Sequence, residues 1–348
     1  MATMSDVAKA AGVSRATASY ALRGDPRIAA ATADKVRAAA DRLRYTANLS
    51  AKSLRSGRSG VIGVAIFELD KPYPSEMSAA ISREAARHGL ETIVQQTANS
   101  KEREISILRK VTSQLCDGTI FSPGNVSGEE LAALYGGKPL ILLDDISDEP
   151  LFDCVFTACE DGAEAAIRHL HSIGCRRVGV IGVDYRALLE DRESTTVSGR
   201  RLAGALKAFD ALGVEVDEHD FIHTLWEVDD ARRCAHRLVD AGMPFDGLFC
   251  MTDTVALGMI RGFADRGVRV PQDVSIIGFD GINEGDYCVP SLTTISTDLD
   301  DLANKAVSLL LLRLDEDARD VPTQERAPMR RLTAAWKLVE RESTHRNA

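Results

Sequence analysis

Residues 3–22 read TMSDVAKAAGVSRATASYAL, which is the pattern of two short helices joined by a tight turn. Thr3 and Asp6 have the spacing of a capping box, in which a hydroxyl and an acid bind the first backbone N–H groups of a helix. Gly12 can end that helix in the left-handed conformation, and Ser14 can cap the next one. The stretch therefore predicts a helix-turn-helix.

A third helix is predicted over residues 32–44, after the chain break GDP at 24–26. The second helix, over 15–23, would leave Arg15, Ala16 and Tyr20 on its exposed side. A helix presented in this way fits the major groove of B-DNA, where the side chains of its first turn reach the base edges.

Charge is unevenly distributed along the 348 residues, whose formal net charge is −10. Residues 1–59 contain eleven Lys or Arg and four Asp, a net charge of +7, which leaves −17 on the rest of the chain. A basic head on an acidic body favours a polyanionic partner for the head, although a solvated basic face is the commoner reason for a run of charge.

The composition, with 45% hydrophobic and 27% charged residues, is that of a globular protein. No apolar run reaches the ~18 residues needed to cross a bilayer, and the first residues have no basic and apolar signal peptide. The seven cysteines are scattered and never spaced as CxxC, which favours reduced thiols over a disulfide framework or a zinc site. We expect a soluble, cytoplasmic protein with no membrane partner.

Beyond the head, apolar runs of strand length alternate with helical stretches. This alternation predicts an α/β body with doubly wound parallel sheets, in which ligands lie beyond the carboxyl ends of the strands. The expected strands are 61–67, 92–95, 118–122, 140–143, 178–182, 247–251 and 274–279. The expected helices are 76–88, 102–114, 163–173, 199–212, 229–241 and 255–265.

Two spaced patterns in the first sixty residues resemble the LacI/GalR family of bacterial repressors. One is DVAKAAGVSRATAS at 6–19, and the other joins TADKV at 32–36 to LRY at 43–45 and SLRSG at 53–57. The resemblance implies a helix-turn-helix head that reads operator DNA and a body that binds a small effector.

By this resemblance, Arg15 and Ala16 occupy the two main base-reading positions, and Tyr20 occupies the third. Members usually have Arg at the third position, whereas a phenol can donate one hydrogen bond or pack on a thymine methyl but cannot grip guanine with two bonds. The operator sequence is therefore not transferable from other members. The resemblance also implies a DNA contact for Thr3, and contacts on the phosphate side for Ser14, Thr17, Arg27 and Thr32.

Two of these side chains also have a purely structural interpretation: Ser14 is suited to an N-cap and Thr17 to a helix interior. Both roles are compatible with a contact to DNA.

Residues 46–59 connect the head to the body and, taken alone, look like a flexible linker. In the family this stretch is a hinge helix that orders on operator DNA, pairs with its dimer mate and inserts a Leu into the minor groove. Leu54 matches that Leu, and Asn48 matches a further hinge position. The usual preceding Pro is Ala47 here, which implies a looser hinge in the free protein.

The body, from 60 to about 341, resembles the two-lobed periplasmic sugar-binding proteins, as the core of the family does. The implied domains are the head at 1–45, the hinge at 46–59, the first lobe at 60–156 and 291–322, the second lobe at 157–290 and 323–341, and a tail at 342–348. The expected fold is an all-α head on a two-lobed α/β core.

The resemblance assigns six residues to an effector cleft between the lobes: Tyr73, Asp144, Arg201, Trp226, Thr252 and Asp280. Thr252 stands where members often have Asn, which leaves the identity of the ligand open. An Arg, two acids and a Trp suit a polyhydroxyl ligand, because each carboxylate can accept two hydroxyl donors. We expect a sugar or sugar derivative first and a nucleobase second.

Two other classes of function remain as alternatives: a solute-binding module without a DNA role, and an enzyme on the same fold. A solute-binding module would lack the basic head. The sequence has no Gly-x-Ser-x-Gly elbow, no phosphate-loop Lys and no clustered metal ligands, so we assign no catalytic residue, cofactor or metal. The favoured prediction is a transcriptional regulator, usually a repressor in this family, that binds a pseudo-palindromic double-stranded operator as a homodimer.

Overall fold

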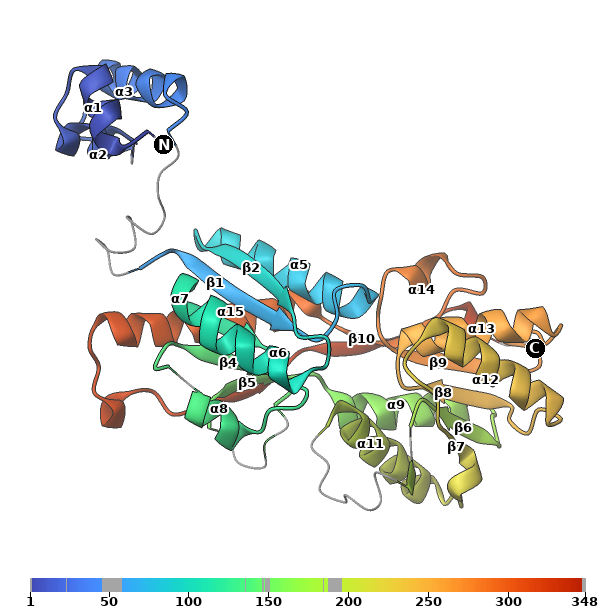
Figure 1. Cartoon of the computed structure of the whole chain (residues 1–348). Helices are drawn as coiled ribbons and strands as arrows, with labels where there is room; N and C mark the ends of the chain where they lie inside the picture. Colours follow the sequence, from blue (N-terminus) through green and yellow to red (C-terminus); the bar gives the residue numbers. More distant parts are fainter. Residues whose placement is uncertain are drawn as a thin grey trace. The chain divides into compact units, whose positions relative to one another are not determined.

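The computed structural model describes residues 2–22, 24–45, 58–134, 136–145, 147, 151–183, 185–186 and 196–345. The chain divides into two compact units, residues 1–60 and residues 61–348 (Figure 1). In the described part of the chain, no helix is both long enough and apolar enough to cross a membrane.

The first unit is a three-helix head made of α1 (Met4–Ala11), α2 (Arg15–Leu22) and α3 (Ala30–Arg42) (Figure 1). Each helix contributes a fully buried side chain to one small core: Val7 from α1, Ala18 from α2 and Val36 from α3. The first two helices lie where the sequence predicts them, and α3 begins two residues earlier than expected.

The helix ends of the head form the caps that the sequence predicts. Thr3 accepts a hydrogen bond from the backbone N–H of Asp6, whose carboxylate accepts one from the backbone N–H of Thr3 in return. Gly12 ends α1 at φ 67°, in the left-handed region that glycine adopts without strain. The left-handed Gly12 lies in the turn between α1 and α2, so the orientation of α2 is determined by local sequence as well as by the core.

The first sheet of the second unit has the strand order β11-β5-β4-β3-β1-β2, and all its described pairs are parallel. Its strands are β1 (Val61–Ile66), β2 (Glu91–Gln96), β3 (Gly118–Phe121), β4 (Leu140–Leu143), β5 (Asp153–Phe156) and β11 (Arg331–Thr333). The helices of this lobe are α5 (Pro72–Arg87), α6 (Lys101–Ser106), the π-helical η1 (Ile107–Thr112), α7 (Ser113–Leu115), α8 (Gly128–Leu134) and α15 (Leu299–Ala318).

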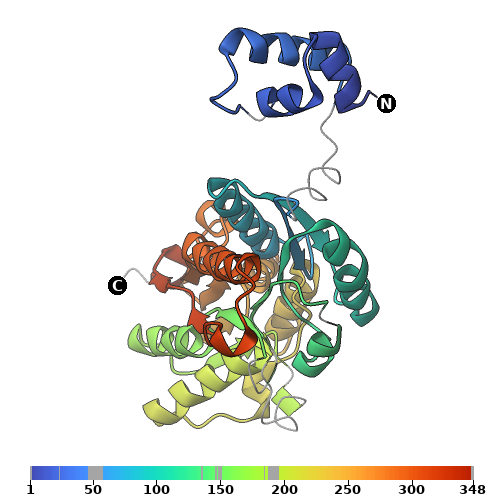
Figure 2. The same ribbon diagram turned by 90° about the vertical axis from the view of Figure 1, so that its left-hand side faces the viewer.

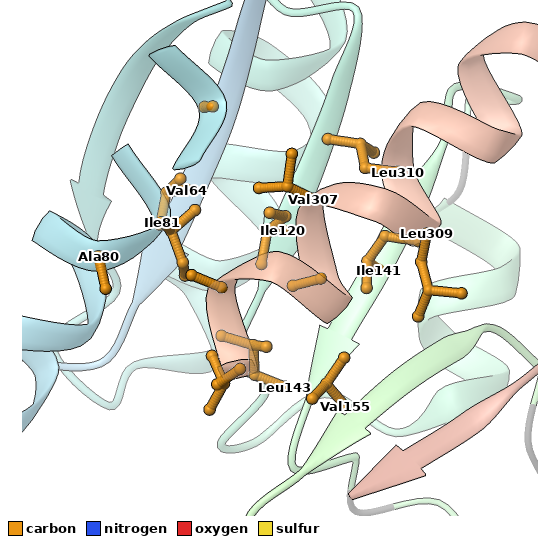
Figure 3. Packing of buried hydrophobic residues seen from close by; sticks show 14 of the residues in the cluster. Val64, Ala80, Ile81, Ile120, Ile141, Leu143, Val155, Val307, Leu309 and Leu310 are labelled. Atoms are coloured by element: carbon orange, nitrogen blue, oxygen red, sulfur yellow. The ribbon is translucent and has the colours of Figure 1, made fainter. Parts of the chain in front are cut away.

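Two of these helices, α5 and α15, cover one face of the first sheet. Ile81 of α5 and Val307 of α15 pack against Val64 and Ile120 of the central strands (Figure 3). The opposite face is covered by α6, η1 and α8, whose apolar side chains meet Phe121. The lobe is therefore a three-layer α/β/α sandwich, and its strands β1 and β4 read as continuous apolar runs because both faces are buried.

The second sheet has the order β12-β10-β9-β8-β6-β7. Its strands are β6 (Val178–Ile181), β7 (Phe221–Ile222), β8 (Gly247–Cys250), β9 (Ser275–Asp280), β10 (Thr293–Thr297) and β12 (Trp336–Val339), and β12 runs antiparallel to β10. The main helices are α9 (Cys159–Ser172) and α11 (Val197–Leu212) on one face, and α12 (Val228–Asp240) and α13 (Asp253–Asp265) on the other (Figure 2). Shorter elements are η2 (Glu218–Asp220), α14 (Glu284–Tyr287), η3 (Thr323–Glu325) and η4 (Glu342–Thr344).

The expected lobe boundaries need correction at two places. The first lobe was expected to contain 291–322, but Thr293–Thr297 forms β10 and pairs with β9 of the second sheet. The second lobe was expected to contain 323–341, but Arg331–Thr333 forms β11 and pairs with β5 of the first sheet. The chain therefore changes lobe between β10 and α15 and again between β11 and β12, because strand pairing and not sequence order decides lobe membership.

The sequence patterns found seven of the twelve described strands and missed five short ones. All seven expected strands are present, within one residue at each end. The short strands β5, β7, β10, β11 and β12 and the 20-residue helix α15 were not predicted. The strands β7 and β11 have only two and three residues, too few for a periodic pattern, and the TTIST of β10 has one apolar residue among four polar ones.

Candidate functional site

The exposed face of α2 carries the three residues expected to read bases. Arg15, Ala16 and Tyr20 are exposed, while Ala18 and Ala21 of the same helix are buried against the rest of the head. Ala16 and Tyr20 are four residues apart and so lie on the same side of the helix. No other described part of the head buries this face, so within the head unit it is accessible to a binding partner.

The hydroxyl groups at the start of α2 stabilise the helix itself. The Ser14 Oγ accepts a hydrogen bond from the backbone N–H of Thr17 at 3.0 Å, and it lies 2.9 Å from the Thr17 hydroxyl. Ser14 is exposed and Thr17 is half-buried. The N-cap interpretation of Ser14 is thus confirmed, and its exposure leaves a contact to a DNA phosphate compatible with it.

The remaining head residues differ in their surroundings. Arg27 is exposed, binds the Asp25 carboxylate and lies against the Tyr20 ring. Thr32 is half-buried in the first turn of α3. Asn48 and Leu54, which we expected in a DNA-binding hinge, lie outside the described residues.

A cavity of about 440 Å³ lies within the second unit, and residues of both lobes line it. All six residues expected to bind the effector are among its lining: Tyr73, Asp144, Arg201, Trp226, Thr252 and Asp280. Tyr73 and Asp144 follow β1 and β4 of the first sheet, whereas Thr252 and Asp280 lie at the ends of β8 and β9 of the second. The site therefore lies where the carboxyl ends of parallel strands from both sheets meet, as such folds require.

Arg201 is the central charged group of this cavity. Its Nη2 donates to Asp280 Oδ1 at 2.8 Å, and its Nη1 donates to the carbonyl of Met251. The guanidinium lies over the Phe279 ring, with 3.7 Å from Cζ to the ring centroid, and 5.6 Å from the centroid of Trp226. Although burial opposes its charge, the facing carboxylate of Asp280 raises the pKa of Arg201. The guanidinium is thus a fixed cation, with its Nε left without a partner among the described residues.

Two buried carboxyl groups lie at the end of β9. Burial raises the pKa of Asp280 to about 6, and Arg201 opposes that shift. Burial also raises the pKa of Asp253 to about 8, and the charge of Asp280 adds to the effect. Asp253 Oδ2 accepts the N–H groups of Gly281 at 2.7 Å and Ile282 at 2.9 Å, so Asp253 holds the backbone that follows Asp280.

The two cavity acids that end strands have unusual backbone conformations. Asp144 has φ 50° and Asp280 has φ 120°, values that L-residues adopt at a cost of about 1–3 kcal/mol. Asp144 Oδ1 accepts hydrogen bonds from the backbone N–H and the hydroxyl of Thr157, both at 2.9 Å. Such strain persists only where surrounding contacts enforce it, and here it accompanies carboxylates that line the cavity.

The aromatic and hydroxyl residues have separate roles. Trp226 donates its Nε1–H to the carbonyl of Gly182 at 2.8 Å, which fixes the indole at the cavity wall. The Tyr73 hydroxyl is buried without a partner among the described residues, and burial raises the pKa of this phenol. Thr252 caps α13 by accepting the Val255 N–H at 3.2 Å, a contact that uses one lone pair of its hydroxyl oxygen.

Several cavity residues were missed by the sequence interpretation. The most consequential are Lys71 and Glu227, which form an ion pair between the first and second lobes. Other polar lining residues are Glu68, Asn99, Ser122, Thr157, Thr196, Ser198 and Thr254. Asn99 and Ser122 follow β2 and β3 closely, so the rule that ligands bind beyond strand ends would have found them. Lys71 and Glu227 have no such signal, because only the tertiary structure brings them together.

The arrangement is suited to binding rather than to bond cleavage. It offers a fixed guanidinium, an indole and several carboxylates and hydroxyls around a cavity, which are donors and acceptors for a polar ring. Within the described ranges, no group of three His, Cys, Asp or Glu is placed to hold a metal ion.

Two family models match this chain, one in each of its two units. Residues 3–48 match the family of bacterial regulatory proteins described as the lacI family, and residues 167–344 match the periplasmic binding protein-like domain. The structure is similar to that of a putative LacI-family transcriptional regulator from Sanguibacter keddieii, with a TM-score of 0.72 and 34% identity over 83% of this chain and 99% of that one.

Two further relatives cover nearly the whole chain. The HTH-type transcriptional repressor PurR of Pasteurella multocida is 28% identical over 330 residues, which is 94% of this chain and 96% of the relative. The Lac repressor bound to ONPG in the repressed state has a TM-score of 0.82 and 25% identity, with 99% of each chain covered. The chain belongs to the LacI family of DNA-binding transcriptional regulators, proteins that join a helix-turn-helix to a periplasmic-binding-protein-like effector domain and are not enzymes.

Proposed function

We propose that this protein is a cytoplasmic repressor that binds a pseudo-palindromic operator as a homodimer. An effector in the cavity either weakens or strengthens its binding to the operator. One head contacts one half-site through α2, so a twofold dimer matches a twofold operator. The observation that carries the DNA role is the exposed face of Arg15, Ala16 and Tyr20, in a stretch, residues 1–59, whose net charge is +7.

Support for a dimer comes from an exposed apolar pair beside α14. Tyr287 is 84% exposed and Val289 is 90% exposed, values unusual for large apolar side chains. Because such side chains gain stability when covered, a second copy of the chain is the proposed partner for this surface. Sedimentation at micromolar concentration tests the proposal; a monomer that also binds a full operator as a monomer would contradict it.

For the effector we propose a sugar or sugar derivative. The fixed Arg201, the Asp280 carboxylate and the Trp226 indole together provide charged hydrogen-bond partners beside an apolar ring face, which suits a polyhydroxylated ring. A nucleobase is the second candidate, because Tyr73 and Trp226 provide aromatic surfaces on which a flat ring can stack. In either case the ligand acts only through its preference for one arrangement of the lobes.

The experiment is a tryptophan fluorescence titration against sugars, sugar phosphates, polyols and nucleobases. The chain contains only two Trp, so Trp226→Phe and Trp336→Phe are matched variants. We expect a saturable change that is lost in Trp226→Phe and kept in Trp336→Phe, because only Trp226 lines the cavity. A change that instead depends on Trp336 would contradict this site for the effector.

A further inference from the structure

The Arg27 side chain is held in one place on the head. Its guanidinium lies over the Tyr20 ring, with 5.0 Å from Cζ to the ring centroid. Asp25 Oδ1 accepts the backbone N–H of Arg27 at 3.0 Å and the Nε–H at 2.9 Å, while Oδ2 accepts from Nη2 at 2.7 Å. The exposed Tyr20 ring and the carboxylate thus fix a cation beside the exposed face of α2.

The contact with Asp25 leaves part of the guanidinium unused. Arg has five N–H donors, and the carboxylate engages the Nε–H and one N–H of Nη2. The Nη1 and Nη2 edge is not engaged by Asp25, and the side chain of Arg27 is 74% exposed. Two parallel N–H groups on such an edge are the fork that binds O6 and N7 of guanine in the major groove.

Tyr20 cannot provide such a fork itself. A phenol offers one hydroxyl and a flat ring, so it cannot make the paired contact to guanine by itself. It can serve as a platform, because a guanidinium stacks on an aromatic face through cation–π attraction. The three side chains of Tyr20, Asp25 and Arg27 therefore act as one unit in which the ring and the carboxylate position the fork.

We propose that Arg27, held over Tyr20 by Asp25, is a specificity-determining residue that reads a guanine in each operator half-site. This inference rests on the proposed DNA-binding function and on α2 as the recognition helix. It replaces the expectation that Arg27 contacts phosphate only. A phosphate contact would weaken binding to all DNA alike, whereas a base contact sets the preference at one position of the site.

The test is selection of binding sites from a random duplex pool by the full-length chain and four variants. Arg27→Ala removes the fork, Asp25→Asn weakens its attachment, and Tyr20→Phe keeps the ring while removing the hydroxyl. Arg37→Ala is the matched control, because Arg37 is also exposed and pairs with an Asp, Asp34, at 2.8 Å. All the substituted residues except Asp25 are exposed, and circular dichroism checks that each head remains helical.

For wild type we expect a guanine enriched at one position of each half-site. Arg27→Ala should reduce the preference for that guanine by about tenfold, the size of one good paired contact, and leave the other positions unchanged. Asp25→Asn should reduce it partly, and both Tyr20→Phe and Arg37→Ala should retain it. Retention in Tyr20→Phe would identify the ring, and not the hydroxyl, as the supporting group.

Two outcomes would overturn the inference, and they are distinguishable. If Arg27→Ala binds selected and random DNA with equal losses and keeps every base preference, Arg27 is a phosphate contact and the DNA-binding function stands. If the wild-type chain enriches no sequence at all, the proposed function itself fails, and this inference fails with it.

Discussion

Arg201, Asp280 and Asp253 form a buried cluster at the end of β9. Arg201 pairs with Asp280, and burial together with the charge of Asp280 raises the pKa of Asp253. Arg201 is 2% exposed and Asp280 is 5% exposed, so neither charge has access to bulk water. Their ion pair at 2.8 Å compensates for that lost hydration. Removing one partner leaves a buried charge that nothing neutralises, which is more damaging than never having had the pair.

We predict that Arg201→Met lowers the free energy of unfolding by about 3–5 kcal/mol at pH 8, the usual cost of an orphaned buried charge. The loss should be smaller at pH 5. Without the Arg201 cation, the pKa of Asp280 rises above its value of about 6, so the carboxyl group is neutral at pH 5. Urea unfolding at the two pH values measures the difference.

The matched control for this prediction is Arg233→Met in the same lobe, because Arg233 is 62% exposed and pairs with Asp230 on the surface. It should change stability by less than about 1 kcal/mol. Equal losses for the two variants, or a loss from Arg201→Met that does not depend on pH, would contradict the interpretation of a buried pair.

Asp253→Asn should remove a pH dependence of stability. Burial raises the pKa of Asp253 from 3.8 to about 8 in the folded chain, so the folded state binds this proton more tightly than the unfolded state. The contribution of Asp253 to stability is then greatest below pH 4 and falls as pH rises towards 8, by up to about 1.4 kcal/mol per pH unit. Asn retains an oxygen for the N–H groups of Gly281 and Ile282 and can donate to Thr294.

The informative window for this variant lies between pH 6.5 and 8, above the pKa of Asp280 at about 6. There the unfolding free energy of wild type should fall faster with pH than that of Asp253→Asn. Parallel curves in denaturant titrations across that window would show that Asp253 is already ionised.

At the scale of elements, α12 and α13 approach each other closely because of two glycines one turn apart. A Cβ added at Gly258 would lie 2.6 Å from the Cβ of Ala231, and one added at Gly262 would lie 2.6 Å from the Cβ of Ala235. Real Cβ atoms do not come that close, so the helices could not pack at this distance with Ala in either position. The spacing of four residues puts both glycines on the same face of α13.

We predict that Gly258→Ala destabilises the protein by about 1–3 kcal/mol, the usual cost of overpacking a close-packed core. The sign of this change in unfolding free energy tests the close packing, because Gly→Ala in a helix interior would otherwise stabilise the helix by about 0.5–1 kcal/mol. Thermal unfolding of the full-length chain measures the change. Arg261→Ala, on the exposed side of the same helix, controls for a general effect on α13; a stabilising Gly258→Ala would contradict the close packing.

At the scale of the whole effector unit, the two lobes are joined across the cavity as well as by the chain. Lys71 pairs with Glu227, and Glu76 Oε1 accepts hydrogen bonds from the backbone N–H and side-chain amide of Asn283 at 3.1 and 2.9 Å. Arg200 of α11 donates to Asp144 of the first lobe at 3.3 Å. These contacts favour the arrangement of lobes seen here. An effector must either add to them or replace them to shift the equilibrium between arrangements of the lobes.

The charge of the whole chain gives a prediction for operator binding. Residues 1–59, the head and the hinge, carry +7 while the remainder carries −17, so net attraction to DNA depends on the head and the hinge. We expect the logarithm of the binding constant to fall linearly with the logarithm of salt concentration, with a slope of about −0.9 for each phosphate neutralised. Fluorescence anisotropy on a selected operator measures the slope. A slope shallower than about −1 would contradict a basic head that contacts several phosphates.

Local rules predicted the helix caps of the head and the strands that lead to the cavity, whereas the six cavity residues were expected from the resemblance to the LacI/GalR family. The caps at Thr3, Gly12 and Ser14 need only neighbours within four residues, and the strands that lead to Asp144 and Asp280 are buried on both faces and therefore mostly apolar. All six expected cavity residues line one cavity. Lys71 and Glu227 were missed because they lie 156 residues apart, and nothing near either residue indicates the other.

The sequence alone determined the helix-turn-helix and the order of the seven apolar strands and six helices that it predicted, since hydrophobic period, capping and turn residues are local properties. Tertiary structure alone decided which sheet receives β10 and β11, because a short strand takes its partner from the space left by the rest of the fold. It also decided the stacking of Arg27 on Tyr20 and the raised pKa of Asp253. Both depend on which groups surround a side chain, and those surroundings are set by the folded structure and cannot be deduced from the order of the residues.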